Sequence, residues 1–270
     1  MWILSSGQLQ LLRFWNDLEP SDQLSLVEQV LCHDLINLNN LFKDARVKRS
    51  CDIKGEIVHR ENTASTFSSS AEERGDWKKL GMEAISKCEV GVILLSGGQA
   101  TRLEADTPKA LFDIGLQSRK TLLQIQAEKI QKLESLAGGK LFWYIMTSEA
   151  TNDAIMEALE NSSYFGMNPD QVKIFSQGTL PCYSDEGDIL LENQSTLATS
   201  PDGNGGLLIA LKDECILADM KLKKLKHLFV YSVDNVLVKI ADPEFLGYCI
   251  SKDADCGNKV NKVKYLYHHS

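Results

Sequence analysis

The segment Gly91-Val92-Ile93-Leu94-Leu95-Ser96-Gly97-Gly98 is the clearest guide to the architecture of this chain. Its short, almost wholly apolar first part is typical of a strand buried in a parallel sheet. Glycine has no side chain to obstruct a close approach, so the turn that follows can bring backbone amides near an anion. The stretch therefore predicts a buried strand that ends in a glycine turn, whose bare amides can approach an anion such as phosphate.

Helical and strand-like patterns alternate on both sides of this strand. A helix that contains Trp77, Leu80, Met82 and Ile85 is expected before it. After it we expect helices at 120–136, 152–159 and around 206–224, and strands at 141–146, 172–175, 189–191 and 228–233. This order predicts an α/β protein with a Rossmann-like, mixed but mostly parallel sheet.

The first seventy residues have a different character. Apolar side chains recur at helical steps over 9–15 and 24–31, with Ser21 as a predicted N-cap, and a third short helix is expected over 35–45. The composition then becomes polar and ends in a run of serines at 65–70. We therefore predict an N-terminal helical region with its connection at residues 1–70 and an α/β domain at residues 71–270.

Composition and charge exclude several classes of protein. The 270 residues are 43% apolar, which is enough for a substantial core, and the net charge of −8 argues against binding nucleic acid by bulk charge. No apolar run approaches the length of a membrane span. Seven cysteines without a Cys-x-x-Cys pair predict reduced thiols. We expect a globular cytoplasmic protein with no nucleic-acid or membrane partner.

Two cationic side chains follow the glycine pair. Arg102 and Lys109 can neutralise a triphosphate and the charge that develops during phosphoryl transfer. Neither the Walker A spacing nor a dinucleotide fingerprint is present. Taken alone, Gly97-Gly98 is better explained by an ordinary strand-to-helix turn with a surface arginine and lysine.

Other segments of the sequence favour a functional interpretation of this turn. The segments 95–103, 108–109 and 118–122 resemble the eukaryotic UDP-N-acetylglucosamine pyrophosphorylase family. Further family-like motifs follow in the family's order at 143–148, 164–166, 175–178, 201–206, 233–235 and 254–257. The likeness runs from about residue 11 to residue 257, so the chain is identified as a member by resemblance.

The resemblance implies a fold, a reaction and a site. The fold is a nucleotidyltransferase (GT-A-like) domain preceded by N-terminal helices, with residues 71–270 as its nucleotide-binding part. The family joins UTP and N-acetylglucosamine 1-phosphate to give UDP-N-acetylglucosamine and pyrophosphate, with Mg²⁺ or Mn²⁺ as cofactor. Arg102 and Lys109 are the implied catalytic residues. The implied nucleotide-binding residues are Leu95, Ser96, Gly97, Gly98, Lys109, Gln177, Gly203, Asn204 and Asp234.

Some of these positions also carry a physical argument. Asp234 follows an apolar strand at the edge where open α/β sheets bind ligands, and its hard carboxylate suits Mg²⁺. Gln177 can pair with a uracil edge through one donor and one acceptor. Gly203 and Asn204 belong to a glycine-rich turn at 201–206. By themselves, these features also fit a turn cap, an exposed glutamine and a surface loop.

The chain departs from the family pattern near the glycine turn and at its end. Ala100 and Glu104 stand where the family has glycines, and added carboxylates should weaken triphosphate binding. Family members continue well beyond Gly257 through the sugar pocket. We therefore expect a C-terminally truncated member with an exposed sheet edge. The alternatives are a catalytically inactive nucleotide-binding or interaction protein, and a pyrophosphorylase for a related sugar.

Overall fold

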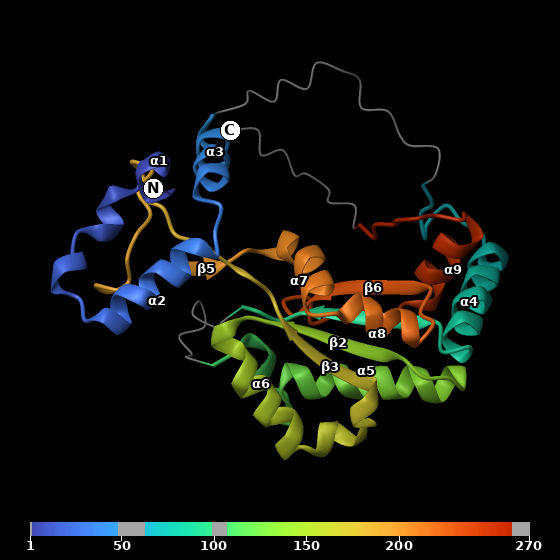
Figure 1. Cartoon of the computed structure of the whole chain (residues 1–270). Helices are drawn as coiled ribbons and strands as arrows, with labels where there is room; N and C mark the ends of the chain where they lie inside the picture. The colour runs from blue at the N-terminus through green and yellow to red at the C-terminus, as the bar shows by residue number, and fades with distance from the viewer. Residues whose placement is uncertain (1, 48–62, 99–106, 261–270) are drawn as a thin grey trace, which may run out of the picture. The chain divides into compact units, whose positions relative to one another are not determined.

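The computed structural model describes residues 2–47, 63–98 and 107–260, which fall into two compact units (Figure 1). The first unit comprises residues 1–58 and 178–206, and the second comprises residues 59–177 and 207–270. This grouping differs from the predicted division at residue 70 chiefly because residues 178–206 join the N-terminal helices. Ala100, Arg102 and Glu104 lie outside the described residues.

The first unit is mainly helical. It contains α1 (Trp2–Ser6), α2 (Pro20–Leu31), α3 (Leu35–Arg46), and the antiparallel pair β4 (Thr179–Pro181) and β5 (Thr199–Pro201). The predicted N-cap at Ser21 is wrong, because α2 begins at Pro20, whose missing N–H is not needed at the first helical position. Residues 9–12 and 15–17 form short 3₁₀ turns rather than the expected α-helix.

Gln8 ties residues 178–206 to the N-terminal helices. Its buried side chain donates to the Gly187 carbonyl at 3.0 Å and accepts from the Ile189 N–H at 2.8 Å. Ile189 is buried in the core of this unit with Leu11 and Leu26. The predicted strand at 189–191 is therefore wrong, because its backbone makes only isolated bridges, with Ile189 buried in this core, Leu191 packed against it and Leu190 exposed.

The second unit is built around a four-stranded parallel sheet in the order β3-β2-β1-β6. Its strands are β1 (Val90–Leu95), β2 (Phe142–Thr147), β3 (Val172–Ser176) and β6 (His227–Ser232). The predicted parallel sheet and these strands are confirmed. Its helices are α4 (Ala71–Ser86), α5 (Leu122–Ala137), α6 (Glu149–Asn161), α7 (Leu207–Asp213), α8 (Ile216–Leu222) and α9 (Pro243–Ser251).

Helices cover both faces of this sheet (Figure 1). Alternate side chains of a strand point to opposite faces, so Val92 and Leu94 pack with α5 and α6 while Ile93 packs with α7 and α8. Helix α4 lies directly against α9, where a methyl group on Gly247 would fall 1.6 Å from the Trp77 carbonyl oxygen. No helix in the described ranges is long and apolar enough to cross a membrane.

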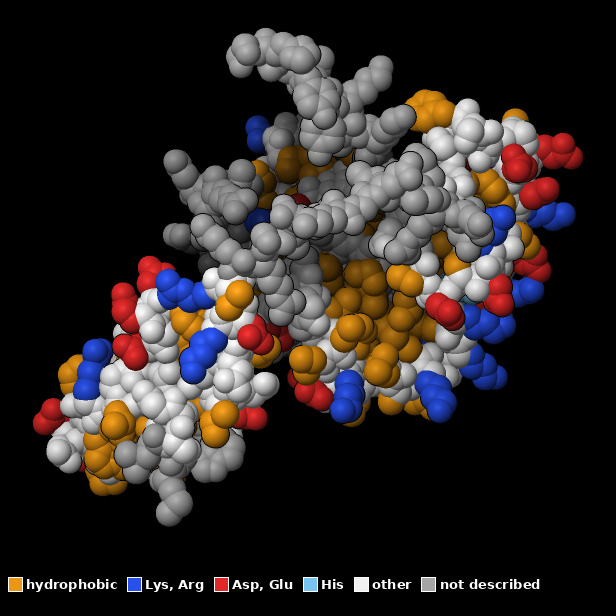
Figure 2. All heavy atoms as spheres, turned by 90° about the horizontal axis from the view of Figure 1, so that it is seen from above, with side chains coloured by type: hydrophobic (Ala, Val, Ile, Leu, Met, Phe, Trp, Pro, Cys, Tyr) orange, Lys and Arg blue, Asp and Glu red, His pale blue; other side chains and the backbone are white. Residues whose placement is uncertain are grey.

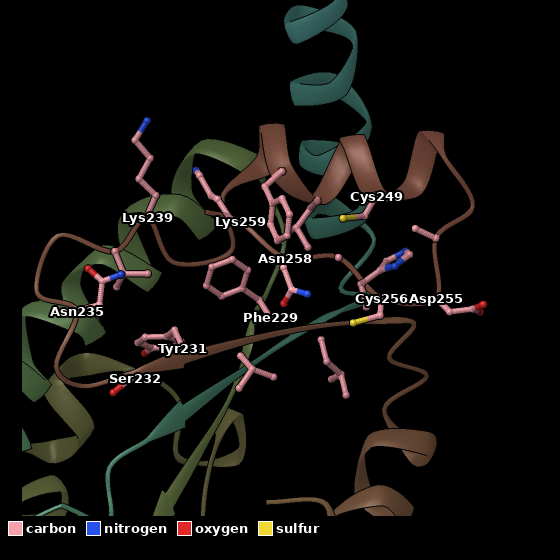
Figure 3. Close-up of a pocket in the computed structure, with 18 of the residues that line it drawn as sticks. Phe229, Tyr231, Ser232, Asn235, Lys239, Cys249, Asp255, Cys256, Asn258 and Lys259 are labelled. Atoms are coloured by element: carbon pink, nitrogen blue, oxygen red, sulfur yellow. The ribbon is translucent and has the colours of Figure 1, made fainter. Parts of the chain in front are cut away.

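Strand β6 forms one edge of the sheet among the described strands. Leu228 and Val230 are 42% and 46% exposed, whereas the intervening Phe229 is buried. Figure 2 shows hydrophobic side chains gathered on this unit's surface. A groove of about 770 Å³ runs beside β6 and is lined also by α9 and residues 254–259 (Figure 3).

Candidate functional site

The loops that follow the parallel strands meet at one edge of the sheet. Strand β1 leads into Ser96-Gly97-Gly98, β2 into Ser148, β3 into Gln177, and β6 into Val233-Asp234. Parallel strands all end at the same edge, which is where open α/β sheets bind their ligands. Because contacts join each of these loops to the next, they form one candidate site.

Gly97 is pressed against the side chain of Gln177. A methyl group on Gly97 would lie 3.2 Å from the carboxamide of Gln177, which is tighter than an ordinary contact. Gln177 is only 9% exposed, and its backbone N–H donates to the Thr147 carbonyl at 2.9 Å. The structure therefore brings these two predicted residues into direct contact, and only glycine fits at position 97 without movement of the glutamine.

The start of helix α6 binds the opposite side of the glycine turn. The hydroxyl of Ser148 donates to the Gly97 carbonyl at 2.8 Å and lies 3.1 Å from the hydroxyl of Thr151. Thr151 Oγ1 in turn lies 3.5 Å from the Ser96 carbonyl oxygen. Ser148 and Thr151 are 2% and 0% exposed, so these contacts are shielded from water.

Lys109 lies beside Gly98 and reaches the loop after β6. Its backbone N–H donates to the Gly98 carbonyl at 3.2 Å, and its Nζ lies 2.8 Å from Asp234 Oδ1. The lysine side chain is 26% exposed and that of Asp234 is 64% exposed. A cation and a carboxylate thus lie together at the mouth of the site, both accessible to a ligand.

Helix α5 contacts the backbone of the loop that carries Asp234. Lys129 Nζ donates to the carbonyl oxygens of Val236 at 2.9 Å and Val238 at 3.3 Å. Burial lowers the pKa of Lys129. Asp234 itself donates its N–H to Ser232 Oγ at 3.3 Å. These contacts fix the backbone on which the exposed carboxylate stands.

The model of the UDPGP family, described as UTP–glucose-1-phosphate uridylyltransferase, matches residues 37–264. The chain belongs to the UDPGP family. The match includes every strand of the parallel sheet and every loop of the candidate site.

Individual proteins resemble the chain over nearly its whole length. UDP-N-acetylhexosamine pyrophosphorylase-like protein 1 of Xenopus tropicalis is 41% identical, over 96% of this chain and 54% of its own length. UDP-N-acetylglucosamine pyrophosphorylase of Saccharomyces cerevisiae is 40% identical, over 95% of this chain and 56% of its own length. The chain therefore spans about half the length of these curated relatives.

A solved structure confirms the fold. The uridine diphosphate N-acetylglucosamine pyrophosphorylase of Trypanosoma brucei, crystallised with an inhibitor, superposes with a TM-score of 0.76 at 26% identity. The match covers 93% of this chain and 54% of the other. The nucleotidyltransferase fold expected from the sequence is thus the fold of a UDPGP-family relative.

The predicted nucleotide-binding residues of this UDPGP-family chain fall into two groups. Leu95, Ser96, Gly97, Gly98, Lys109, Gln177 and Asp234 all belong to the second unit, at or beside the sheet edge. Gly203 and Asn204 are exposed and belong to the first unit. Arg102, the second predicted catalytic residue, lies outside the described residues. A role in nucleotide binding stays a prediction for all of them.

The predicted turn at 201–206 is present, and its glycines have a physical cause. Gly203 has a φ of +75°, a left-handed conformation that favours glycine. A methyl group on Gly206 would lie 1.8 Å from Asp202 Oδ1, so a side chain there would displace the carboxylate. Burial raises the pKa of Asp202, and its Oδ1 has no hydrogen-bond partner among the described residues.

The sheet edge offers one carboxylate, that of Asp234, as a ligand for a divalent cation. Among the described residues, no group of three or more His, Cys, Asp or Glu side chains could hold a metal ion. Asp234 supplies a single exposed carboxylate, and Mg²⁺ is often held by one or two carboxylates together with substrate phosphates and water. Asp234 therefore fits a magnesium ion that arrives with its nucleotide.

Two contributors to the site were missed from the sequence. Ser148 stands between a predicted strand and a predicted helix, which is the position of an N-cap, and that signal could have drawn attention to it. Lys129 gave no such signal, because a lysine within a helical pattern is normally read as part of the solvated face. Its contacts with Val236 and Val238 are visible only in the structure.

Proposed function

We propose that the chain binds UTP at the carboxyl edge of the sheet and transfers its uridylyl group to N-acetylglucosamine 1-phosphate. One observation carries the proposal: the Gly97-Gly98 backbone lies between the carboxamide of Gln177 and the ion pair of Lys109 with Asp234. A carboxamide, bare amides and a cation thus follow one another along the site, in the order of the base and the phosphates of a nucleoside triphosphate.

Each group has a distinct task in this proposal. The carboxamide of Gln177 pairs with the uracil edge through one donor and one acceptor. The amides of Gly97 and Gly98 donate to phosphate oxygens, which glycine permits because no side chain intervenes. The ammonium of Lys109 neutralises charge on the triphosphate as it develops.

The reaction needs alignment more than covalent help from the protein. An oxygen of the sugar phosphate attacks the α-phosphorus of UTP, a new P–O bond forms, and the bond to pyrophosphate breaks on the opposite side. Mg²⁺ or Mn²⁺ bound with the nucleotide would neutralise phosphate charge, with Asp234 as its protein ligand. Arg102 is a further cation assigned to this step by resemblance.

The choice of sugar phosphate rests on the relatives. The yeast protein is named for UDP-N-acetylglucosamine, whereas the family description names glucose 1-phosphate. We therefore propose N-acetylglucosamine 1-phosphate as the preferred sugar substrate, with related sugar 1-phosphates as the alternative. A cytoplasmic location is part of the same proposal.

The test combines binding and turnover on the full chain. UTP is titrated by calorimetry with Mg²⁺ present, and pyrophosphate release is then measured with N-acetylglucosamine 1-phosphate, N-acetylgalactosamine 1-phosphate and glucose 1-phosphate in parallel. Fastest release with the first sugar supports the proposal. Binding without release for any sugar would instead indicate a non-catalytic nucleotide-binding protein, and absence of UTP binding would overturn the site itself.

A further inference from the structure

We propose that Ser148 is a positioning residue that aims the Gly98 N–H at a nucleotide phosphate. The inference rests on the proposed UTP binding and adds a residue to it. Its basis is the 2.8 Å hydrogen bond from Ser148 Oγ to the Gly97 carbonyl oxygen. Gly97 follows β1, and Ser148 is a buried residue at the start of α6.

Because the peptide bond is planar, this contact also sets the direction of the Gly98 N–H. The carbonyl of Gly97 and the N–H of Gly98 belong to one planar trans unit, so they point in opposite directions. Because Ser148 draws the carbonyl toward α6, the N–H of Gly98 must face away from that helix. The Lys109 side chain lies close by, 3.6 Å from the position that a methyl group on Gly98 would take.

The preceding peptide unit is held in the same way. The N–H of Ser96 donates to the Met146 carbonyl at 2.8 Å, which fixes the turn to strand β2. The carbonyl of Ser96 lies 3.5 Å from Thr151 Oγ1, so the Gly97 N–H also faces away from α6. Neither glycine N–H has an acceptor within the described part of the chain. Both amides therefore face away from α6, the direction from which an anion would approach in this proposal.

Ser148 forms a capping box with Thr151 at the start of α6, and its hydroxyl makes one further contact that a cap does not need. A capping serine acts through its oxygen, which accepts from a backbone N–H of the first turn. The contact with Gly97 uses the hydroxyl proton, which capping leaves free, and the Thr151 N–H also donates to the Ser148 carbonyl at 3.0 Å. Helix formation alone does not account for the bond to the glycine turn.

The test separates orientation of the amide from simple loss of stability. Ser148→Ala removes the donor, and Thr151→Val removes the neighbouring hydroxyl while keeping the shape of the side chain. Ser162→Ala is the matched control, because Ser162 Oγ also donates to backbone carbonyls but at the other end of α6. For each protein, calorimetry measures affinity for UTP and ligand-observed NMR measures affinity for uridine.

We expect Ser148→Ala to weaken UTP binding about tenfold, the order of one hydrogen bond to a charged group, and to leave uridine binding unchanged. Thr151→Val should show a smaller loss, and Ser162→Ala none. Equal affinity of Ser148→Ala and wild type for UTP would overturn the role of Ser148, as would parallel losses for UTP and uridine. A wild-type chain that binds no UTP would instead refute the proposed function.

A second measurement does not use the Ser148 variant and keeps the inference testable should Ser148→Ala not fold. Wild-type chain labelled with ¹⁵N at its 18 glycines is titrated with UTP, and the amide resonances are followed. Conversion of Gly97 or Gly98 to alanine identifies their two signals. Both are expected to shift as the phosphates bind, and amide signals that stay fixed at saturating UTP would overturn the inference.

Discussion

Lys109 and Asp234 form an ion pair of 2.8 Å although 125 residues separate them in the sequence. Lysine comes from the turn after β1 and aspartate from the loop after β6, two strands that are neighbours in the sheet. The aspartate is 64% exposed, and ion pairs this open contribute only about 0–1 kcal/mol to stability. Both charges are thus available for ligand binding at little cost to the fold.

The first prediction concerns Lys109→Met. We expect the free energy of unfolding to change by less than about 1 kcal/mol, because the pair is solvated. We expect kcat to fall about 100-fold, because the ammonium neutralises phosphate charge in the transition state. Urea denaturation and steady-state kinetics measure the two effects.

Lys120→Met is the matched control for this prediction. It breaks a comparable exposed ion pair, Lys120 with Glu128 at 2.7 Å, and removes the same charge. Its kcat should stay near that of the wild type. If the two lysine variants lost activity equally, Lys109 would have no special role at the site.

The second prediction compares two adjacent glycines. Gly97→Ala should weaken UTP binding about tenfold, because its methyl group would lie 3.2 Å from the Gln177 carboxamide and move this group, which we propose binds the base, by a few tenths of an ångström. Gly98→Ala should cost less, since its methyl group would meet the Lys109 side chain at an ordinary 3.6 Å. Calorimetry with UTP gives both affinities, and a larger loss for Gly98→Ala would contradict the prediction.

The strands and the turn of this fold could be predicted because their signals are local. An apolar run buried on both faces, such as 90–95, is recognisable without knowledge of its neighbours. The same rule failed at 189–191, because a short apolar run is equally suited to a helical core, and its burial there depends on contacts with residues near the N-terminus. Periodicity cannot distinguish these two environments.

The site was predictable only in part for a related reason. Gly97, Gln177 and Asp234 follow strands of a parallel sheet, so their common edge could be expected from the order of elements. The hydrogen bonds of Ser148 to the glycine turn and of Lys129 to the β6 loop join segments far apart in the sequence. Such contacts depend on how helices pack against the sheet, which residue type and spacing do not specify.

The third prediction concerns a buried polar contact that links β2, β6 and α5. The hydroxyl of Tyr231 accepts from Trp143 Nε1 at 3.1 Å and donates to Gln126 Oε1 at 3.1 Å. Burial raises the pKa of Tyr231, so the hydroxyl stays protonated. Tyr231→Phe would leave two buried polar groups unpaired, and we expect it to lower the free energy of unfolding by about 1–3 kcal/mol.

Tyr248→Phe is the control for this measurement. The ring of Tyr248 packs edge-on against that of Trp77, with 5.0 Å between the ring centroids. The Tyr248 hydroxyl has no hydrogen bond within the described ranges. Removing that oxygen should change the urea midpoint much less than Tyr231→Phe does. Equal midpoints for the two variants would show that the Tyr231 contacts contribute nothing measurable.

The fourth prediction is a pH dependence carried by Asp219. Burial by itself would raise the pKa of this carboxyl group, but the Tyr144 hydroxyl at 2.8 Å and the ammonium of Lys223 at 3.0 Å hold it below the ordinary value of 3.8. A pKa lowered by folding stabilises the folded state above the ordinary value. That stabilisation is lost as the pH falls through the pKa of the folded state.

Asp219→Asn should therefore lower the free energy of unfolding by about 1 kcal/mol at pH 7, where the wild-type carboxylate is fully ionised. The difference from wild type should shrink as the pH falls below the ordinary value of 3.8, because the wild-type group then becomes neutral as well. Urea midpoints at pH 7, 5, 4 and 3 measure this convergence, with Asp213→Asn on the exposed end of α7 as the matched control. A constant difference across that range would mean that ionisation of Asp219 does not stabilise the fold.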